Sequence, residues 1–170
     1  MINFTIWQNT NNKRLKHVNF DKIKGSFNFL DYYPTFEGEI DISQIPGTDE
    51  NILNLLLLRF GGIGKDSEHL LLKDMFGNSR PLETGDIIQL EDVYYYTNKY
   101  SWEKITSEVL EQAEAWIYRE KLLDLLDDRG WDYTTDARYR LLMILGNREI
   151  DISLNDKDAI HDLYQEIINW

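Results

Sequence analysis

The chain has 170 residues, and its 30 acidic and 18 basic side chains give a formal net charge of −12. This charge argues against direct binding to nucleic acid or to anionic membranes, which attract basic surfaces. The chain contains no cysteine, so disulfides and thiol nucleophiles are excluded. Its first residues show no basic and apolar pattern and no apolar run reaches membrane-spanning length, so we expect a cytoplasmic protein without a signal peptide.

The first predicted elements are short strands. Phe4 to Trp7 has high β-propensity, and the alternating segment His17 to Phe20 is expected to return as a second strand after a turn. Residues 31–42 are expected to be extended, with an interruption at Pro34. These segments predict a small sheet near the start of the chain.

A helix is predicted from Asp49 to Phe60, with Thr48 as its cap and Gly61-Gly62 as its end. Its apolar face is expected to contain Ile52, Leu55, Leu56 and Leu58. A hairpin follows, in which the segment from Arg80 to Leu90 leads through a turn at Glu91-Asp92 into a strand from Val93 to Thr97.

The remaining chain reads as helical. One long helix or two abutting helices are predicted at 103–128, another helix at 135–145, and a last helix capped by Asn155 with a core stripe from Ile160 to Ile168. Residues 1–100 carry a net charge of −4 and residues 101–170 a net charge of −8.

We therefore predict an α+β fold, in which a small mixed or antiparallel sheet with one or two helices is followed by an acidic C-terminal helical region. The predicted domains are an α+β domain at 1–102 and the acidic helical region at 103–170.

A glycine-rich segment at 61–66 superficially resembles a phosphate-binding loop. That loop requires Gly, four residues and then Gly-Lys-Ser/Thr, whereas Lys65 is followed here by Asp66 and position 59 is an arginine. The histidines at 17, 69 and 161 show no metal-ligand spacing. We expect no catalytic residue, no cofactor and no metal site, while an enzyme using a carboxylate-bound metal stays open as an alternative.

The last predicted helix places Asp158, Asp162 and Glu166 at i, i+4 and i+8 along one ridge, each about 6 Å from the next. Neighbouring like charges cost roughly 0.2–0.5 kcal/mol per pair in a helix. A ridge that folding does not require is available for recognition, and it roughly imitates the phosphate ladder of DNA. The alternative interpretation is an ordinary solvated acidic face.

Further acidic residues of the helical region are expected to extend this partner-binding surface. They are Glu108, Glu111, Glu114, Asp124, Asp127 and Asp128. The last three lack the glycine-containing spacing of a calcium loop, so we interpret them as part of the acidic surface.

Several segments, in order along the chain, resemble the YodL-like domain family over about residues 1–106. The resemblance rests on Phe4 to Gln8, Phe36 to Glu39, Arg80 to Leu90, Tyr94 to Tyr96 and Tyr100 to Ile105. The chain departs from the family pattern at Ser79 to Glu83 and at Asn98 to Ser101. The resemblance implies an accessory protein of a mobile element or phage, for which anti-defence is a natural role, and it brings no catalytic residues.

The leading hypothesis from the sequence is an anti-CRISPR or anti-restriction inhibitor. It would act as an acidic DNA mimic on the basic nucleic-acid-binding face of a host nuclease, such as a Cas9-type effector or its guide-RNA complex, or a restriction enzyme. The alternative is a non-enzymatic protein–protein adaptor with an aromatic surface. Its candidate residues are Tyr94, Tyr95, Tyr96, Tyr100, Trp102 and Trp170.

Overall fold

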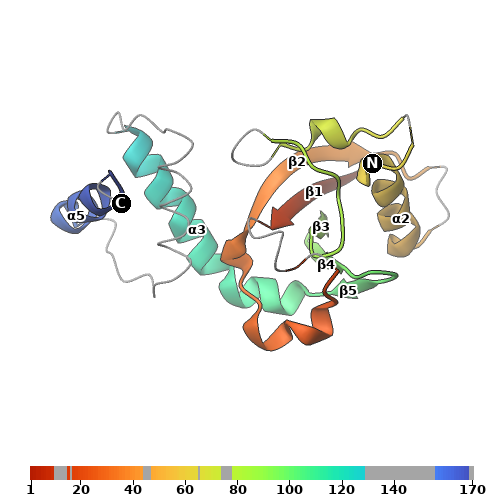
Figure 1. The fold of residues 1–170 in the computed structure, drawn as a ribbon, viewed down its shortest axis with the longest axis horizontal. Coiled ribbons are helices and arrows are strands. Elements are labelled where there is room, and N and C mark those ends of the chain that lie inside the picture. The colour runs from red at the N-terminus through yellow and green to blue at the C-terminus, as the bar shows by residue number, and fades with distance from the viewer. Residues whose placement is uncertain are drawn as a thin grey trace. The chain divides into compact units, whose positions relative to one another are not determined.

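The structure is a computed structural model that describes residues 1–9, 15, 17–43, 47–64, 66–73, 78–128 and 156–168. The chain divides into two compact units. The sheet unit comprises residues 1–27 and 31–110, and the helical unit comprises residues 28–30 and 111–170. A five-stranded antiparallel sheet with a few helices confirms the predicted α+β class (Figure 1).

The sheet has the strand order β2-β1-β3-β4-β5, and every neighbouring pair is antiparallel. Its strands are β1 (Ile2–Asn9), β2 (Tyr32–Ile40), β3 (Ile87–Leu90), β4 (Val93–Thr97) and β5 (Trp102–Lys104). The predicted hairpin is confirmed as β3 and β4, with Leu90 opposite Val93 and Glu91 at a φ of 48° in the turn. The predicted first strand and extended segment are confirmed as β1 and β2.

The predicted strand at 17–20 is wrong, because β1 pairs with β2 and β3 and this segment forms no strand. Phe20 begins the short 3-10 helix η1 (Phe20–Lys22), which is followed by η2 (Lys24–Ser26) and η3 (Phe29–Asp31). The Phe20 ring packs at centroid distances of 5.3 Å from Phe27 and 5.2 Å from Tyr96. Packing of this aromatic cluster outweighs the local β-pattern.

Helix α2 (Asp49–Phe60) confirms the predicted helix, but the predicted apolar face is only half correct. The side chains that it buries are Ile52, Leu53, Leu56 and Phe60. Leu55 and Leu58 are instead 39% and 64% exposed. Thr48 accepts backbone hydrogen bonds through its carbonyl, while its side chain makes no capping bond.

Both faces of the sheet bury side chains, because successive strand residues point to opposite sides and the neighbours Ile87 and Ile88 are both fully buried. The main core lies on the α2 face, where Phe4, Ile6, Ile88 and Tyr95 join the buried residues of α2. Tyr96 points to the other face and contacts Phe20. A further 3-10 helix, η4 (His69–Leu71), precedes the loop that leads into β3.

The long predicted helix is a single helix, α3 (Thr106–Asp128), and it starts later than predicted because residues 102–104 form β5. The expected domain boundary at 102/103 therefore falls inside β5, and the sheet unit extends to Leu110. Ile105 and Val109 are fully buried, which ties the start of α3 to this unit.

The last helix, α5, spans Lys157–Ile168, and Ile160 and Leu163 are buried as predicted. Its first amides are capped by Asp156, whose Oδ1 accepts from the backbone N–H groups of Asp158 and Ala159 at 3.1 and 3.0 Å. The predicted cap, Asn155, and the predicted helix at 135–145 lie outside the described residues. None of the helices described is both long and apolar enough to cross a membrane.

Candidate protein-binding surface

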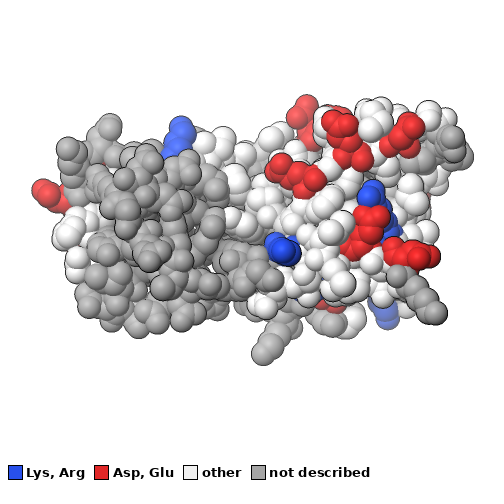
Figure 2. All heavy atoms as spheres, turned by 90° about the horizontal axis from the view of Figure 1, so that it is seen from above, with Lys and Arg blue, Asp and Glu red and all other residues white. Residues whose placement is uncertain are grey.

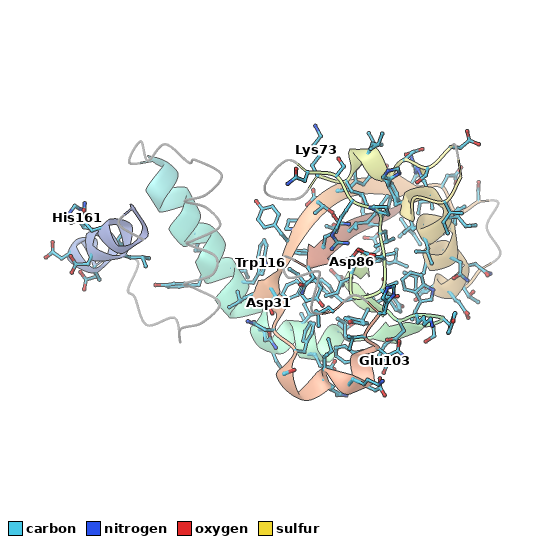
Figure 3. All side chains as sticks on the ribbon, in the orientation of Figure 1. Asp31, Lys73, Asp86, Glu103, Trp116 and His161 are labelled. Atoms are coloured by element: carbon cyan, nitrogen blue, oxygen red, sulfur yellow. The ribbon has the colours of Figure 1, made fainter. Side chains whose placement is uncertain are left out.

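A buried ion pair fixes the end of β1 to the loop before β3. The guanidinium of Arg80 donates to both carboxylate oxygens of Asp86, at 2.5 and 2.7 Å, and Asp86 is only 1% exposed. The same carboxylate accepts from the backbone N–H groups of Asn9 and Glu83. Burial raises the pKa of Asp86, and Arg80 opposes this rise. Asp86, which is labelled in Figure 3, thus joins the end of β1 to the loop before β3.

The aromatic segment of β4 contributes mainly to the core. Tyr95 and Tyr96 are buried, and their hydroxyls donate to the Asp49 carboxylate and to the Val18 carbonyl. Burial raises the pKa of both hydroxyls. Among the aromatic residues considered for an adaptor surface, Tyr100 is 87% exposed, Tyr94 and Trp102 are half-buried, and Trp170 lies outside the described residues.

Exposed carboxylates lie on β2, directly after it, and in the first turn of α2. Residues 25–58 contain no lysine or arginine, and the exposed acids of this stretch are Glu37, Glu39, Asp41, Asp49 and Glu50. Hydrogen bonding from the Ser43 backbone N–H, at 2.9 Å, lowers the pKa of Asp41. A stretch of this length without a basic residue was a sequence signal for an acidic surface that the predicted sites missed.

The excess of acid is visible on the described surface of the sheet unit (Figure 2). Its other exposed acids are Asp21, Asp66, Glu91, Asp92 and Glu103. The exposed lysines described in this unit are Lys22, Lys24, Lys73, Lys99 and Lys104. Exposed acids therefore outnumber exposed lysines among the described residues of this unit, and none of these lysines lies within residues 25–58.

The sequence predicted exposed carboxylates at Glu108, Glu111 and Glu114, but Glu108 is paired and partly buried. Its carboxylate lies 3.0 Å from the Lys24 ammonium and is 18% exposed, and this hydrogen bond lowers the pKa of Glu108. Glu111 is exposed. The side chains of Glu114, Asp124, Asp127 and Asp128 lie outside the described part of the structure. The structure thus places Glu108 in an ion pair within the sheet unit.

The structure describes the side chains of two of the three acids in the predicted ridge on α5. Asp158 and Asp162 are both exposed and one helical turn apart, which corresponds to about 6 Å between neighbouring positions. The Glu166 side chain lies outside the described residues. Asp158 also follows the cap at the N-terminus of α5, where the helix dipole favours a negative charge.

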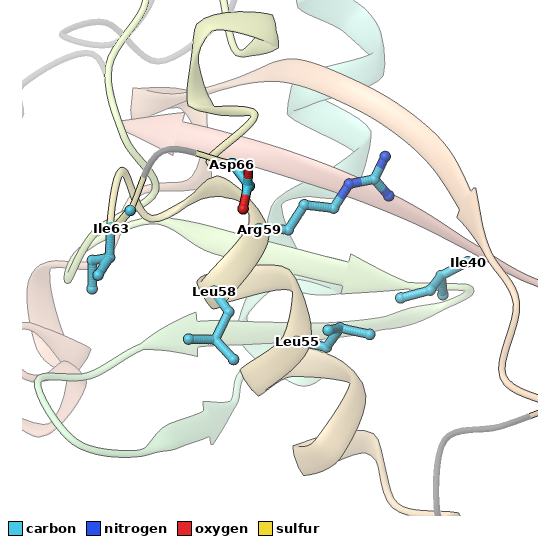
Figure 4. Close-up of a pocket in the computed structure, with 7 residues that line it drawn as sticks. Ile40, Leu55, Leu58, Arg59, Ile63 and Asp66 are labelled. Atoms are coloured by element: carbon cyan, nitrogen blue, oxygen red, sulfur yellow. The ribbon is translucent and has the colours of Figure 1, made fainter.

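An apolar groove of about 370 Å³ lies where the exposed side of α2 meets the end of β2 (Figure 4). Its walls are Ile40, Leu55, Leu58, Arg59, Ile63, Gly64 and Asp66. The Arg59 guanidinium forms an ion pair with Glu68 at 2.7 Å, so its charge is already neutralised. Exposed leucines and an isoleucine around such a groove are typical of a protein-binding surface.

The glycine-rich segment at 61–66 follows the C-terminus of α2. Its amides therefore do not extend a helix N-terminus, as they do in a phosphate-binding loop. Gly62 and Gly64 adopt positive φ angles of 72° and 91°, which explains why the turn requires glycine. Asp66, which excluded the phosphate-loop interpretation, instead lines the groove. Among the described residues, no three metal-ligating side chains gather at one point.

No family model matches the chain, and no curated protein or solved structure matches it either. The resemblance to the YodL-like family stays a prediction from the sequence. The surface itself, with its exposed carboxylates and apolar groove, is the basis for a proposal about function.

Proposed function

We propose that this protein binds and inhibits a host nuclease, as an anti-defence protein of a mobile element or phage acting in the cytoplasm. Its acidic surface would occupy the basic channel in which a Cas9-type effector or a restriction enzyme holds nucleic acid. Carboxylates can accept bidentate hydrogen bonds from the arginines of such a channel, much as phosphates do.

The observation that carries this proposal is the set of exposed carboxylates on residues 25–58, a stretch without any lysine or arginine. Glu37 and Glu39 belong to this set, and Asp158 and Asp162 supply a second exposed pair on α5. Exposed ion pairs contribute little to stability, so exposed acids such as Glu37 and Glu39 need no partner within the fold, and we take them as available for recognition.

The test is a DNA-cleavage assay with a Cas9-type effector loaded with guide RNA and, in parallel, a restriction enzyme. We expect the protein to slow cleavage by one of these nucleases at low salt and to lose this effect at high salt, because the attraction is electrostatic. The combined variant Asp158→Ala, Asp162→Ala and Glu166→Ala reports on α5, and Glu37→Lys with Glu39→Lys reports on β2. A protein that neither binds nor slows either class of nuclease contradicts the proposal.

A second candidate function is a protein–protein adaptor. The apolar groove suits this role better than the aromatic segment of β4 does. Leu58 and Ile63 are 64% and 73% exposed beside the groove, whereas Tyr95 and Tyr96 are buried. An adaptor of this kind would bind its partner with little dependence on salt. Leu58→Asp, at the groove, would weaken such binding more strongly than the removal of acidic residues.

A further inference from the structure

Strand β2 lies at one edge of the sheet, and its backbone register shows which of its groups face outward. The backbone N–H and carbonyl of Asn3, in β1, both point toward β3. The N–H donates to the Glu91 carboxylate, and the carbonyl accepts from the Glu91 N–H. Backbone groups alternate in direction along an antiparallel strand, so Ile2 and Phe4 bond toward β2. Their partners there are Ile40 and Gly38.

It follows that Glu37 and Glu39 direct their N–H and carbonyl groups away from β1, toward the open edge. At the start of β2, the Lys73 N–H donates to the Thr35 carbonyl from outside the sheet, at 3.4 Å, and Pro34 offers no N–H. Within the described residues no such bond reaches Glu37 or Glu39. Among the described residues, the second half of β2 therefore presents an edge without backbone partners, which is a template for another strand.

The side chains of this edge differ between the two faces of the sheet. Glu37 and Glu39 are both exposed on one face. Phe36 and Gly38 lie on the other face, because a Cβ on Gly38 would meet the Phe36 and Phe4 rings at 3.0 and 3.1 Å. Ile40 continues this apolar face and is also one wall of the groove beside α2.

We propose that β2 binds an extended segment of a partner protein by strand addition, and that this segment alternates basic and apolar residues. Lysine or arginine side chains opposite Glu37 and Glu39 would form cross-strand pairs of opposite charge. The intervening apolar side chains would follow Phe36 and Ile40 and reach the groove lined by Leu55 and Leu58. Backbone hydrogen bonds supply affinity in this mode of recognition, and the alternate side chains supply specificity.

A second copy of the chain is a poorer occupant, because antiparallel pairing of two β2 edges places glutamates opposite glutamates, which is unfavourable. This inference deepens the proposed function, on which it rests for the basic character of the partner. It assigns the first contact to a basic strand of the partner.

The experiment uses the full chain and a short fluorescent peptide that alternates lysine and valine. Fluorescence anisotropy measures the dissociation constant of this peptide and of two control peptides. One control peptide has the same composition with paired lysines and paired valines, and the other is methylated at the amides that face β2. We expect both controls to bind at least about tenfold more weakly, because one loses the alternation and the other loses backbone hydrogen bonds.

Protein variants make the test specific to the edge. Glu39→Pro removes an outward N–H and leaves the bonds to β1 intact, so we expect it to weaken the alternating peptide while the thermal midpoint changes little. Glu37→Lys with Glu39→Lys is expected to abolish binding. Asp21→Lys with Asp92→Lys changes the net charge equally at exposed positions outside β2 and is expected to retain most of the affinity.

Equal binding of the alternating and paired peptides would overturn the inference, as would an equal loss in the two charge-reversed variants. Dimerisation that Glu39→Pro abolishes would assign the edge to a second copy and would also overturn it. If the peptide fails to bind while nuclease inhibition persists, the strand site is wrong and the proposed function stands. If the peptide binds and no nuclease is inhibited, the proposed function fails and the strand site stands.

Discussion

Asp86 and Glu39 are acidic residues of the same sheet unit, and their surroundings are opposite. Asp86 is 1% exposed and accepts hydrogen bonds from Arg80 and from the backbone at Asn9 and Glu83. Glu39 is exposed, and no described residue donates to its carboxylate. A buried charge has to be paired for the fold to tolerate it, whereas an exposed charge is nearly neutral for stability. Exposure thus separates the acids that hold this fold from those available to a partner.

The largest expected effect comes from breaking the buried pair. Arg80→Met leaves the Asp86 carboxylate buried without its main partner, and we expect a loss of about 3–5 kcal/mol in the free energy of unfolding. Chemical denaturation measures this loss. The matched control is Glu37→Gln with Glu39→Gln, which we expect to change stability by no more than about 0.5 kcal/mol. Similar losses in both proteins would remove the distinction between the two kinds of acid.

The two sides of α2 offer the same contrast for leucines. Leu56 is 0% exposed and Leu58 is 64% exposed. Leu56→Ala is expected to cost about 2–5 kcal/mol, because it leaves a cavity in the main core. Leu58→Ala is expected to stay within about 0.5 kcal/mol, which thermal denaturation of both variants can check. A large cost at Leu58 would mean that the groove is part of the folding core.

Gly85, which precedes the buried Asp86, adopts a backbone conformation that favours glycine. Its φ is 104°, and a Cβ there would meet the Leu15 carbonyl oxygen at 3.1 Å. Gly85→Ala is therefore expected to cost about 1–3 kcal/mol through backbone strain. Gly25→Ala is a suitable control, since a Cβ at Gly25 meets nothing within 4 Å and Gly25 is not among the glycines with positive φ. Equal stability of the two variants would contradict the strained geometry.

The Lys24–Glu108 pair is intermediate between the two kinds of acid and has the smallest expected effect. Lys24 lowers the pKa of Glu108, so the pair stabilises the fold above the unfolded pKa of this carboxyl and loses its effect as the pH falls through the folded pKa. Glu108→Gln is expected to cost less than about 1 kcal/mol at neutral pH. Denaturation at several pH values should show this difference shrinking in acid, and a difference that grows in acid would contradict the pairing.

Local patterns were sufficient to predict elements that neighbouring residues determine. The hairpin of β3 and β4 has a short turn between two strands, and α2 is bounded by Thr48 and Gly61. The segment at 17–20 was missed because Phe20 is held by contacts with Phe27 and Tyr96. Its N–H also donates to Asn98, which is 78 positions away, and such distant partners leave no local signal.

The candidate surface was predictable only in part. The exposed positions Asp158 and Asp162 follow from the period of the helix. The ion pair of Glu108 joins residues far apart in the sequence and left no local trace. Leucines on several sides of α2 made its buried face ambiguous, so the groove at Leu55 and Leu58 was missed. The open edge at Glu37 and Glu39 depends on the strand order, which the sequence pattern does not determine.

The most direct test of the central claim is the affinity of the protein for a Cas9-type effector loaded with guide RNA, measured at low and at high salt. The account predicts that binding weakens steeply as salt rises, and that Glu37→Lys with Glu39→Lys weakens it strongly at low salt while Asp21→Lys with Asp92→Lys has a smaller effect. Binding that is equally tight at both salt concentrations and indifferent to these charge reversals would contradict recognition through the acidic surface.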